Sequence, residues 1–167
     1  MQIPKRKNDH LNEIKFDPNI TQSKLDELQK DYDRMIIKVR PKLSAEVKRL
    51  AELGDFSENA EYQLAKGKLR GLNNRAENIK FRIDHAKIIK PNNDTSRVSL
   101  GHFVTIKKGG IEKTYQILGS FETNPTTGSI SDSSPLGSKL LNKKVGDSFS
   151  LIINDKSTTI KITNIKS

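Results

Sequence analysis

The stretch "YQLAKGKLRGLNNRAENIKFRIDHA", Tyr62 to Ala86, carries the clearest periodic pattern in the chain. Its apolar residues recur at alternating steps of three and four, which is the spacing of a helix that packs along one seam. Because a stripe this narrow buries only one side, the pattern predicts a long helix with a second helix beside it. The stripe consists of Tyr62, Ala65, Leu69, Leu72, Ala76, Ile79, Ile83 and Ala86.

A second stripe with the same spacing starts after Thr21, a residue suited to capping a helix. Pro41 interrupts it, so the helix either kinks there or a new helix begins with Pro41 in its first turn. Gly54 is typical of a helix end. The two stripes predict an antiparallel helical hairpin, or coiled coil, over residues 21–90, with arms reaching about 45 Å. The second stripe consists of Leu25, Leu28, Tyr32, Met35, Val39, Leu43, Val47 and Leu50.

The charges of this hairpin are unevenly distributed. Residues 66–90 carry eight basic and two acidic residues, whereas residues 52–61, the predicted tip, carry four acidic residues and no basic one. A basic helix is often only a solvated face, but it also suits contact with a nucleic-acid backbone. The pattern therefore predicts a basic shaft with an acidic tip.

The acidic tip has two interpretations. Asp55 and Glu58 are three residues apart, like a capping box, and carboxylates near a helix N-terminus are stabilised by its dipole. Four acids in ten positions exceed what one cap needs, however, and two such carboxylates can share a hard cation such as Mg²⁺. Since Mg²⁺ takes about six oxygen ligands, the tip would supply half a site and another molecule would complete it.

The rest of the chain predicts a separate β domain. Residues 1–20 show no period and are interpreted as a flexible leader, and residues 91–98 have the composition of a linker. From residue 99 to residue 167 the period changes to two, with a hairpin turn at Gly109 and Gly110 and two more strands on either side of about residues 154–157. The fold class is α+β, a helical hairpin followed by a small antiparallel β domain.

Composition narrows the function classes. The 167 residues carry a net charge of +10 and no cysteine, which excludes disulfides, thiolate catalysis and zinc–cysteine sites and favours a polyanionic partner. His10, His85 and His102 show no ligand spacing. There is no signal peptide and no apolar span of about 20 residues, so we expect a soluble cytoplasmic protein.

Two motifs resemble the bacterial Gre (GreA/GreB) transcript-cleavage factors of RNA polymerase. The first is "GDFSENAEYQLAK", residues 54–66, preceded by Arg40–Pro41 and followed by the basic helix. The second is "SSPLGSKLLNKKVGD", residues 133–147, in the predicted β domain. The resemblance extends from about Thr21 to the C-terminus and leaves the leader unmatched.

This resemblance implies a transcription elongation factor whose coiled coil enters the secondary channel of RNA polymerase, with an FKBP-like β domain docked near the channel entrance. In the family, the tip acids help the polymerase to hold a catalytic Mg²⁺ and to cleave the backtracked RNA 3′ end. Here those acids are Asp55 and Glu58, with Ser57 and Asn59 supporting the tip geometry or contact with the substrate. Basic residues of the hairpin contact the RNA; the candidates are Lys66, Lys68 and Arg70. The protein would act as a monomeric accessory factor without enzymatic activity of its own, and the branch, GreA or GreB, stays open.

Two other functions remain open from the sequence. One is a binder of the same channel that inhibits RNA polymerase without promoting cleavage, although the intact Asp55 and Glu58 disfavour inhibitors with altered tips. The other is a free-standing enzyme, either a metal-dependent nuclease or a prolyl isomerase in the β domain. The incomplete ligand set argues against the nuclease, and the few aromatic residues of the β domain argue against the isomerase.

Overall fold

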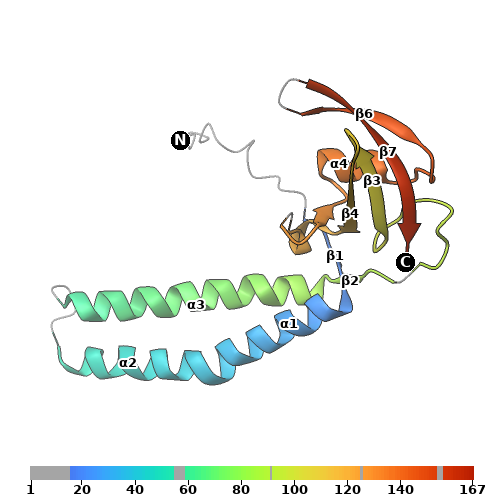
Figure 1. Cartoon of the computed structure of the whole chain (residues 1–167). Helices are drawn as coiled ribbons and strands as arrows, with labels where there is room; N and C mark the ends of the chain where they lie inside the picture. Colours follow the sequence, from blue (N-terminus) through green and yellow to red (C-terminus); the bar gives the residue numbers. More distant parts are fainter. Residues whose placement is uncertain (1–15, 55–58, 91, 125, 154–155) are drawn as a thin grey trace, which may run out of the picture.

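The computed structural model describes residues 16–54, 59–90, 92–124, 126–153 and 156–167. Two long helical arms lie side by side and point away from a small sheet domain (Figure 1). The first arm consists of α1 (Gln22–Asp33), the π-helix η1 (Arg34–Val39) and α2 (Arg40–Glu52). The second arm is a single helix, α3 (Ala60–Asp84). The predicted hairpin fold is confirmed.

The first arm stays helical through Pro41 because the turn before the proline is widened. Proline has no N–H to donate and its ring clashes with the carbonyl four residues earlier. The wider turns of η1 accommodate this, and the N–H of Arg40 donates to the carbonyl of Met35, five residues back. A π-helix shifts the faces that follow it. As a result Val39 is 36% exposed, so its predicted place in the seam is wrong, and Ile36 packs against the hairpin core instead.

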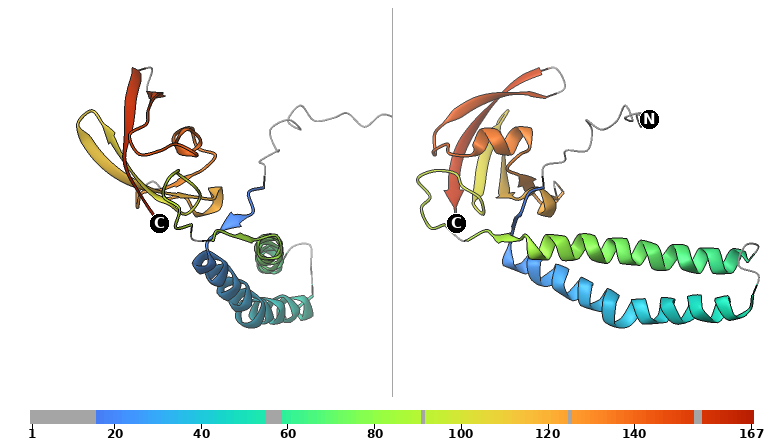
Figure 2. Two further views of the ribbon diagram at one scale, coloured as in Figure 1. Left: turned by 90° about the vertical axis from the view of Figure 1, so that its right-hand side faces the viewer. Right: turned by 180° about the vertical axis from the view of Figure 1, so that it is seen from behind.

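The hairpin core is a narrow seam, as the sequence predicts. Its buried residues include Leu28 and Met35 from the first arm and Ala76 and Ile79 from α3. Alanine on α3 allows the arms to approach closely. Near the far end of the arms, Leu50 and Ala65 are also buried. The right-hand view in Figure 2 shows the two arms running alongside each other, and the buried residues of both arms form one core cluster between them.

The second half of the chain forms a five-stranded sheet in the order β5-β4-β3-β7-β6. The β4–β5 pair is parallel and the other pairs are antiparallel. Gly109 and Gly110 form the predicted turn between β3 and β4, and both have the positive φ that a two-residue hairpin loop requires. The elements are β3 (Phe103–Lys108), β4 (Ile111–Leu118), the 3₁₀ helix η2 (Ser120–Glu122), β5 (Ser129–Ser131), α4 (Pro135–Leu140), β6 (Ser148–Ile153) and β7 (Lys156–Lys166).

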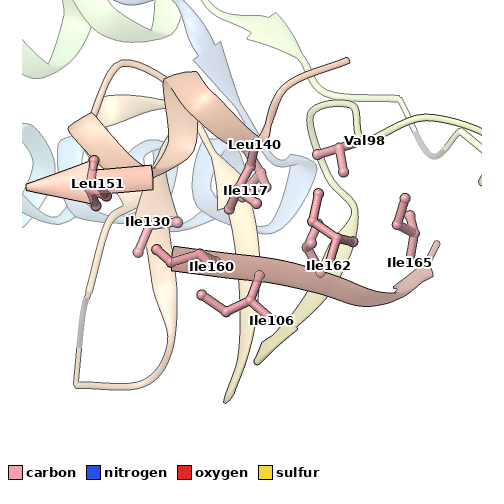
Figure 3. Packing of buried hydrophobic residues seen from close by; sticks show 10 residues of the cluster. Val98, Ile106, Ile117, Ile130, Leu140, Leu151, Ile160, Ile162 and Ile165 are labelled. Atoms are coloured by element: carbon pink, nitrogen blue, oxygen red, sulfur yellow. The ribbon is translucent and has the colours of Figure 1, made fainter. Parts of the chain in front are cut away.

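The sheet curls around a second core that alternating strand residues supply. Figure 3 shows Leu140 of α4 beside Ile117 of β4, with Ile162 of β7 on the same side of the sheet. These three side chains have 0% exposure. Val98, which the sequence analysis places in the linker, is 1% exposed and belongs to this core, so the predicted linker extends one residue too far.

The predicted leader also extends too far. Asn19–Ile20 forms the short strand β1, which pairs in parallel with β2 (Lys87–Ile88) just after α3. Ile20 is only 4% exposed and joins the hairpin core. Phe16 contacts Phe81 edge-on, with ring centroids 5.0 Å apart. Residues 16–20 thus close the base of the hairpin, and residues 1–15 lie outside the described part of the chain.

Candidate functional site: the hairpin tip and shaft

The two helix ends that flank the acidic stretch in the sequence lie at the end of the hairpin that is remote from the sheet (Figure 1). On one side, α2 ends at Glu52, and Gly54 follows with a φ of 76°, the left-handed conformation that terminates many helices. On the other side, Asn59 precedes the first turn of α3. Asp55, Ser57 and Glu58, three of the four residues that the sequence analysis assigns to the tip site, fall in residues 55–58, outside the described residues.

The N-cap of α3 is Asn59. Its side-chain oxygen accepts a hydrogen bond from the backbone N–H of Tyr62 at 3.0 Å. This satisfies one of the amides that every helix start leaves unpaired. The capping-box interpretation, with Asp55 as the cap, is therefore wrong, because the cap of this helix is four residues further on. A direct contact between Asn59 and a substrate stays a prediction.

The three predicted RNA-contacting residues are all exposed on α3, but they do not share one face. Lys66 and Arg70 are four residues apart and so project on the same side of the helix. Lys66 also lies over the ring of Tyr62, with its Nζ 5.7 Å from the ring centroid. Lys68 is two residues from each and projects on the opposite side. The helix geometry therefore groups Lys66 with Arg70 and separates both from Lys68, and contact of any of the three with RNA stays a prediction.

Lys68 instead lines a cleft between the two arms, close to the tip. On the α2 side of this cleft, the guanidinium of Arg49 donates to both carboxylate oxygens of Glu46, at 2.8 and 3.1 Å. These hydrogen bonds lower the pKa of Glu46 and raise that of Arg49. Glu61 lines the same cleft on the α3 side. The sequence alone does not place Arg49 in a cleft with Lys68 and Glu61, because the residues that meet between the arms depend on the relative rotation of the arms.

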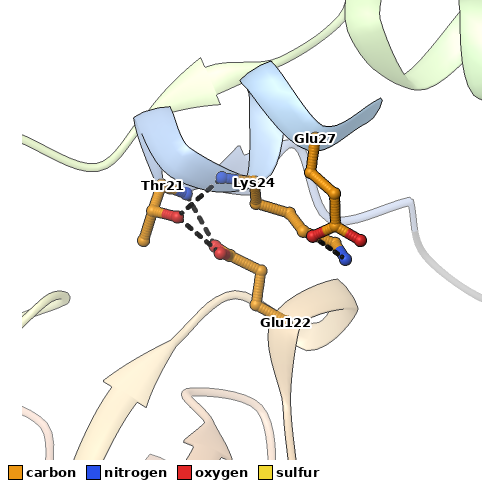
Figure 4. Close-up of polar contacts among 4 residues, drawn as sticks. All are labelled: Thr21, Lys24, Glu27 and Glu122. Carbon is orange, nitrogen blue, oxygen red and sulfur yellow. Dashed lines mark hydrogen bonds and ion pairs between the residues drawn. The ribbon is translucent and has the colours of Figure 1, made fainter. Parts of the chain in front are cut away.

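The hairpin base is joined to the sheet domain by Glu122 of η2 (Figure 4). Its carboxylate accepts from the backbone N–H of Thr21 at 2.6 Å and from the Thr21 hydroxyl at 2.5 Å. The same hydroxyl oxygen accepts from the N–H of Lys24 and so caps α1, as the sequence predicts. Nothing in the sequence pairs Thr21 with a residue 101 positions away, so this contact was missed.

Two further contacts fix the same junction. The carboxylate of Asp17 accepts from the N–H of Ser120 at 2.6 Å and from the N–H of Asn19 at 3.0 Å. Burial raises the pKa of Asp17, but these hydrogen bonds outweigh it and hold the pKa below its ordinary value of 3.8. The guanidinium of Arg82 lies 4.0 Å from the ring centroid of Phe121, a cation–π contact. One member of the basic shaft is thus engaged within the protein.

Among the described residues, no helix is long and apolar enough to pass through a bilayer. No group of three or more histidine, aspartate or glutamate side chains there is gathered as a metal site would require. The ring of His102 is buried in the sheet domain, where its Nε2–H donates to the carbonyl of Asn92 at 2.7 Å. This hydrogen bond connects the start of β3 to the segment that follows the hairpin.

Comparison with known proteins gives matches over both halves. The family model "Transcription elongation factor, N-terminal" matches residues 19–88, and "Transcription elongation factor, GreA/GreB, C-term" matches residues 92–167. Transcription elongation factor GreA of Leuconostoc mesenteroides is 37% identical over 144 residues, covering 84% of this chain and 90% of that protein. GreA of Treponema pallidum is 34% identical over 149 residues, covering 87% and 92%. The crystal structure of GreA factor homolog 1 (Gfh1) of Thermus thermophilus aligns with 21% identity and a TM-score of 0.42, covering 91% of this chain and all of that one.

Fold and sequence together define a transcription elongation factor. The chain belongs to the GreA/GreB family. The resemblance on which the sequence analysis relied is confirmed, as is the fold class.

Proposed function

We propose that this protein stimulates the cleavage of backtracked RNA by RNA polymerase and so rescues arrested elongation complexes. The observation that carries the proposal is the position of the acidic stretch. Gly54 and Asn59, which flank Asp55 and Glu58, stand at the remote end of a long narrow hairpin, and the cap of α3 is made by Asn59. In this proposal the carboxylates of Asp55 and Glu58, which lie between Gly54 and Asn59 in the sequence, act on a partner.

The donor chemistry of the tip fits a divalent cation that is shared with the partner. Asp55 and Glu58 would supply hard carboxylate oxygens, which Mg²⁺ prefers, and the polymerase and RNA phosphates would supply the rest. When bound, the ion stabilises charge on the attacking and leaving oxygens of the phosphodiester. The residues of this chain position the ion and the RNA, while the catalytic centre belongs to the polymerase. The protein is thus proposed to be an accessory factor without enzymatic activity of its own.

The basic shaft would guide the extruded RNA. Lys66 and Arg70 project on one side of α3, and among the described residues neither forms an ion pair with a carboxylate. By contrast Lys80 is paired with Asp84 at 2.6 Å. The unpaired cations near the tip are therefore available for phosphates, and each such contact adds to the salt dependence of binding. Lys68, in the cleft with Glu46, would contribute less than the sequence analysis expects.

The proposal also covers the binding partner, the oligomeric state and the location of the protein. The hairpin would enter the secondary channel as a monomer, and the sheet domain would dock near the entrance. The family assignment supports a partner in the transcription machinery and hence a cytoplasmic location, and the net charge of +10 supports a polyanionic partner. Residues 1–15 have no assigned role in this proposal.

Stalled, backtracked elongation complexes test the proposal directly. The wild-type protein should release short 3′-terminal RNA fragments, and Asp55→Asn or Glu58→Gln should lower the cleavage rate by about a hundredfold or more, because each removes a transition-state ligand. Glu52→Gln is the matched control, since it removes the same charge from the last turn of α2 and should cleave normally. Equal and low cleavage by the wild type and Asp55→Asn would contradict the proposal.

The same assay separates the other functions. Slower nucleotide addition without RNA fragments would identify an inhibitor that only blocks the channel. Cleavage of naked RNA without polymerase would identify a nuclease. For the shaft, Lys66→Ala and Arg70→Ala should weaken cleavage more at low salt than at high salt, because each removes a phosphate contact and so lowers the salt dependence of binding. Lys80→Ala, at a paired position, should leave that dependence unchanged.

A further inference from the structure

The sheet domain carries two lysines on the side of the sheet that forms its core. Residues that face one another across a strand pair lie on the same side of the sheet. Lys113 of β4 pairs with buried Ile106, and Lys108 of β3 pairs with Ile111 and with buried Ile160. Alternation places apolar residues at such positions when the side is simply packed. Cations at inward positions therefore call for an explanation.

These lysines surround an open apolar cavity of about 420 Å³ at the turn end of β3 and β4. Ile106 forms its floor with 3% exposure, while Ile111 is 67% exposed although it is on the core side. No described residue of α4 lines the cavity, because this short helix covers the other end of the sheet, beside Ile117 (Figure 3). A volume of this size lies within the range of ligand pockets, about 300–1,000 Å³.

The strand beside the cavity has an open edge. In the described residues, β5 pairs only with Gln116–Leu118 of β4, which leaves Ile111–Tyr115 without a strand on its outer side. In a two-residue hairpin the residues flanking the turn form a hydrogen-bonded pair, so Ile111 and Lys113 direct their backbone groups to β3. Glu112 and Thr114 then direct theirs outward. Consistent with this register, the N–H of Gln116 donates outward to the carbonyl of Gly128 at 2.9 Å.

We infer that this edge and cavity form a docking site for an extended, acidic and apolar segment of a partner protein. The segment would add a strand along β4 and hydrogen-bond to the outward N–H and C=O of Glu112 and to the outward N–H of Thr114. The carbonyl of Thr114 lies against Gly128 and marks the end of the open edge. Its apolar side chains would cover Ile106 and Ile111, and its carboxylates would meet the ammonium groups of Lys108 and Lys113. The site is remote from the hairpin tip and does not depend on the proposed cleavage function.

Charge and shape favour a peptide over a nucleic acid. The cavity lining is mainly aliphatic, with Tyr115 as its one aromatic ring among the described residues. Single-stranded nucleic acids bind chiefly by stacking on several aromatic rings. An exposed aliphatic surface with two cations and an open strand edge suits alternating apolar and acidic side chains instead. The opposite side of the sheet offers Lys107 next to Lys108, a matched lysine that does not line the cavity.

The test titrates the full-length protein with a capped peptide of alternating valine and glutamate and follows backbone amide resonances by NMR. We expect shifts centred on Ile111–Tyr115 and Thr158. Lys113→Glu should weaken binding by about ten- to a hundredfold, the effect of losing a charged hydrogen bond, while Lys107→Glu should bind like wild type. Both positions are exposed, and unchanged thermal unfolding of both variants will show that each is folded.

Modified peptides add a second readout. N-methylation at alternate positions removes donors from one edge of the peptide only, so one of the two alternate methylation patterns should abolish binding and the other should not. Replacing glutamate by lysine should also abolish binding.

The alternative is that the inward-pointing lysines only prevent the open edge of β4 from pairing with other chains, and that the edge binds no partner. In that case the peptide would not bind, and Lys113→Val would instead make the protein self-associate. Either that outcome or stronger binding of oligouridine than of the peptide would overturn the inference.

Discussion

The hairpin and the sheet domain are stabilised in different ways. In the sheet domain, Leu140, Ile117 and Ile162 are completely buried, whereas the hairpin seam relies on side chains with residual exposure, such as Ile79 at 8%. All four ion pairs among the described residues lie within one or the other arm of the hairpin, between residues three or four apart. Pairs of this kind contribute little to stability, about 0.3–0.5 kcal/mol each.

This difference indicates which part of the protein can hold functional residues without a large loss of stability. A domain with one closed core loses much when any core residue changes. A hairpin whose stability is spread along a seam and many local contacts can hold an acidic cluster at its end without losing the rest of the arm. The junction between the two, at Glu122 and Asp17, then determines the direction in which the hairpin points.

The largest effect should come from the sheet core. Leu140→Ala removes a side chain that is fully buried against β4 and leaves a cavity, so it should lower the free energy of unfolding by about 2–5 kcal/mol. Leu72→Ala, at a half-buried position of the seam, should lower the free energy of unfolding by less. Chemical denaturation of each variant measures this, and an equal loss for the two would break the distinction between the domains.

The junction should respond next. A Cβ on Gly119 would lie 1.9 Å from the carbonyl oxygen of Asn19, so Gly119→Ala must displace β1 from η2. We expect a loss of about 1–3 kcal/mol and a changed interdomain distance in small-angle X-ray scattering. Gly71→Ala is the control: nothing lies within 4 Å of its Cβ position on α3, and it should stabilise the protein by up to about 1 kcal/mol. An unchanged scattering profile for Gly119→Ala would show that this junction does not fix the orientation.

A smaller effect is expected at the tip. Asn59→Ala removes the cap of α3 and should cost about 1 kcal/mol, whereas Asn59→Asp, which keeps an acceptor, should cost almost nothing. Thermal unfolding monitored by circular dichroism compares the two. If cleavage falls in Asn59→Asp while stability is retained, Asn59 also contacts the substrate, as the sequence predicts.

The smallest effect should come from pH. Because the pKa of Asp17 is lowered in the folded protein, its contribution to stability is complete above the ordinary value of 3.8 and is lost as the pH falls through the lower folded pKa. Asp17→Asn should therefore flatten the acid limb of the stability–pH profile and leave its shape near neutral pH unchanged. The same slope in both proteins below pH 3.8 would exclude this contribution.

Much of the fold could be predicted because the sequence records local patterns. The three–four spacing of α3, the capping by Thr21 and the glycine pair of the β3–β4 turn each act over a few residues, and each prediction was correct. The prediction that Val39 lies in the seam was wrong, because the π-helix before Pro41 changes the helical spacing. The sequence could not show this, since a helix can accommodate a proline either by kinking or by widening the preceding turn.

For the candidate site too, contiguous features could be predicted from the sequence and contacts between the arms could not. Asp55, Glu58 and their neighbours could be named from the sequence because their motif is contiguous, and the position of the tip follows from the two helices that flank it. The helical period alone separates Lys68 from Lys66 and Arg70, but the position of Lys68 in a cleft with Glu46 depends on the rotation of α3 against α2.

By itself the sequence determined two helical arms, an acidic turn between them and an alternating sheet, because period, capping and turn chemistry act between near neighbours. Only the tertiary structure decided that Glu122 reaches Thr21, that residues 16–20 close the hairpin base and that Lys108 and Lys113 border an open cavity. These contacts join residues far apart in the chain, and their energies depend on distances that exist only after the elements have packed.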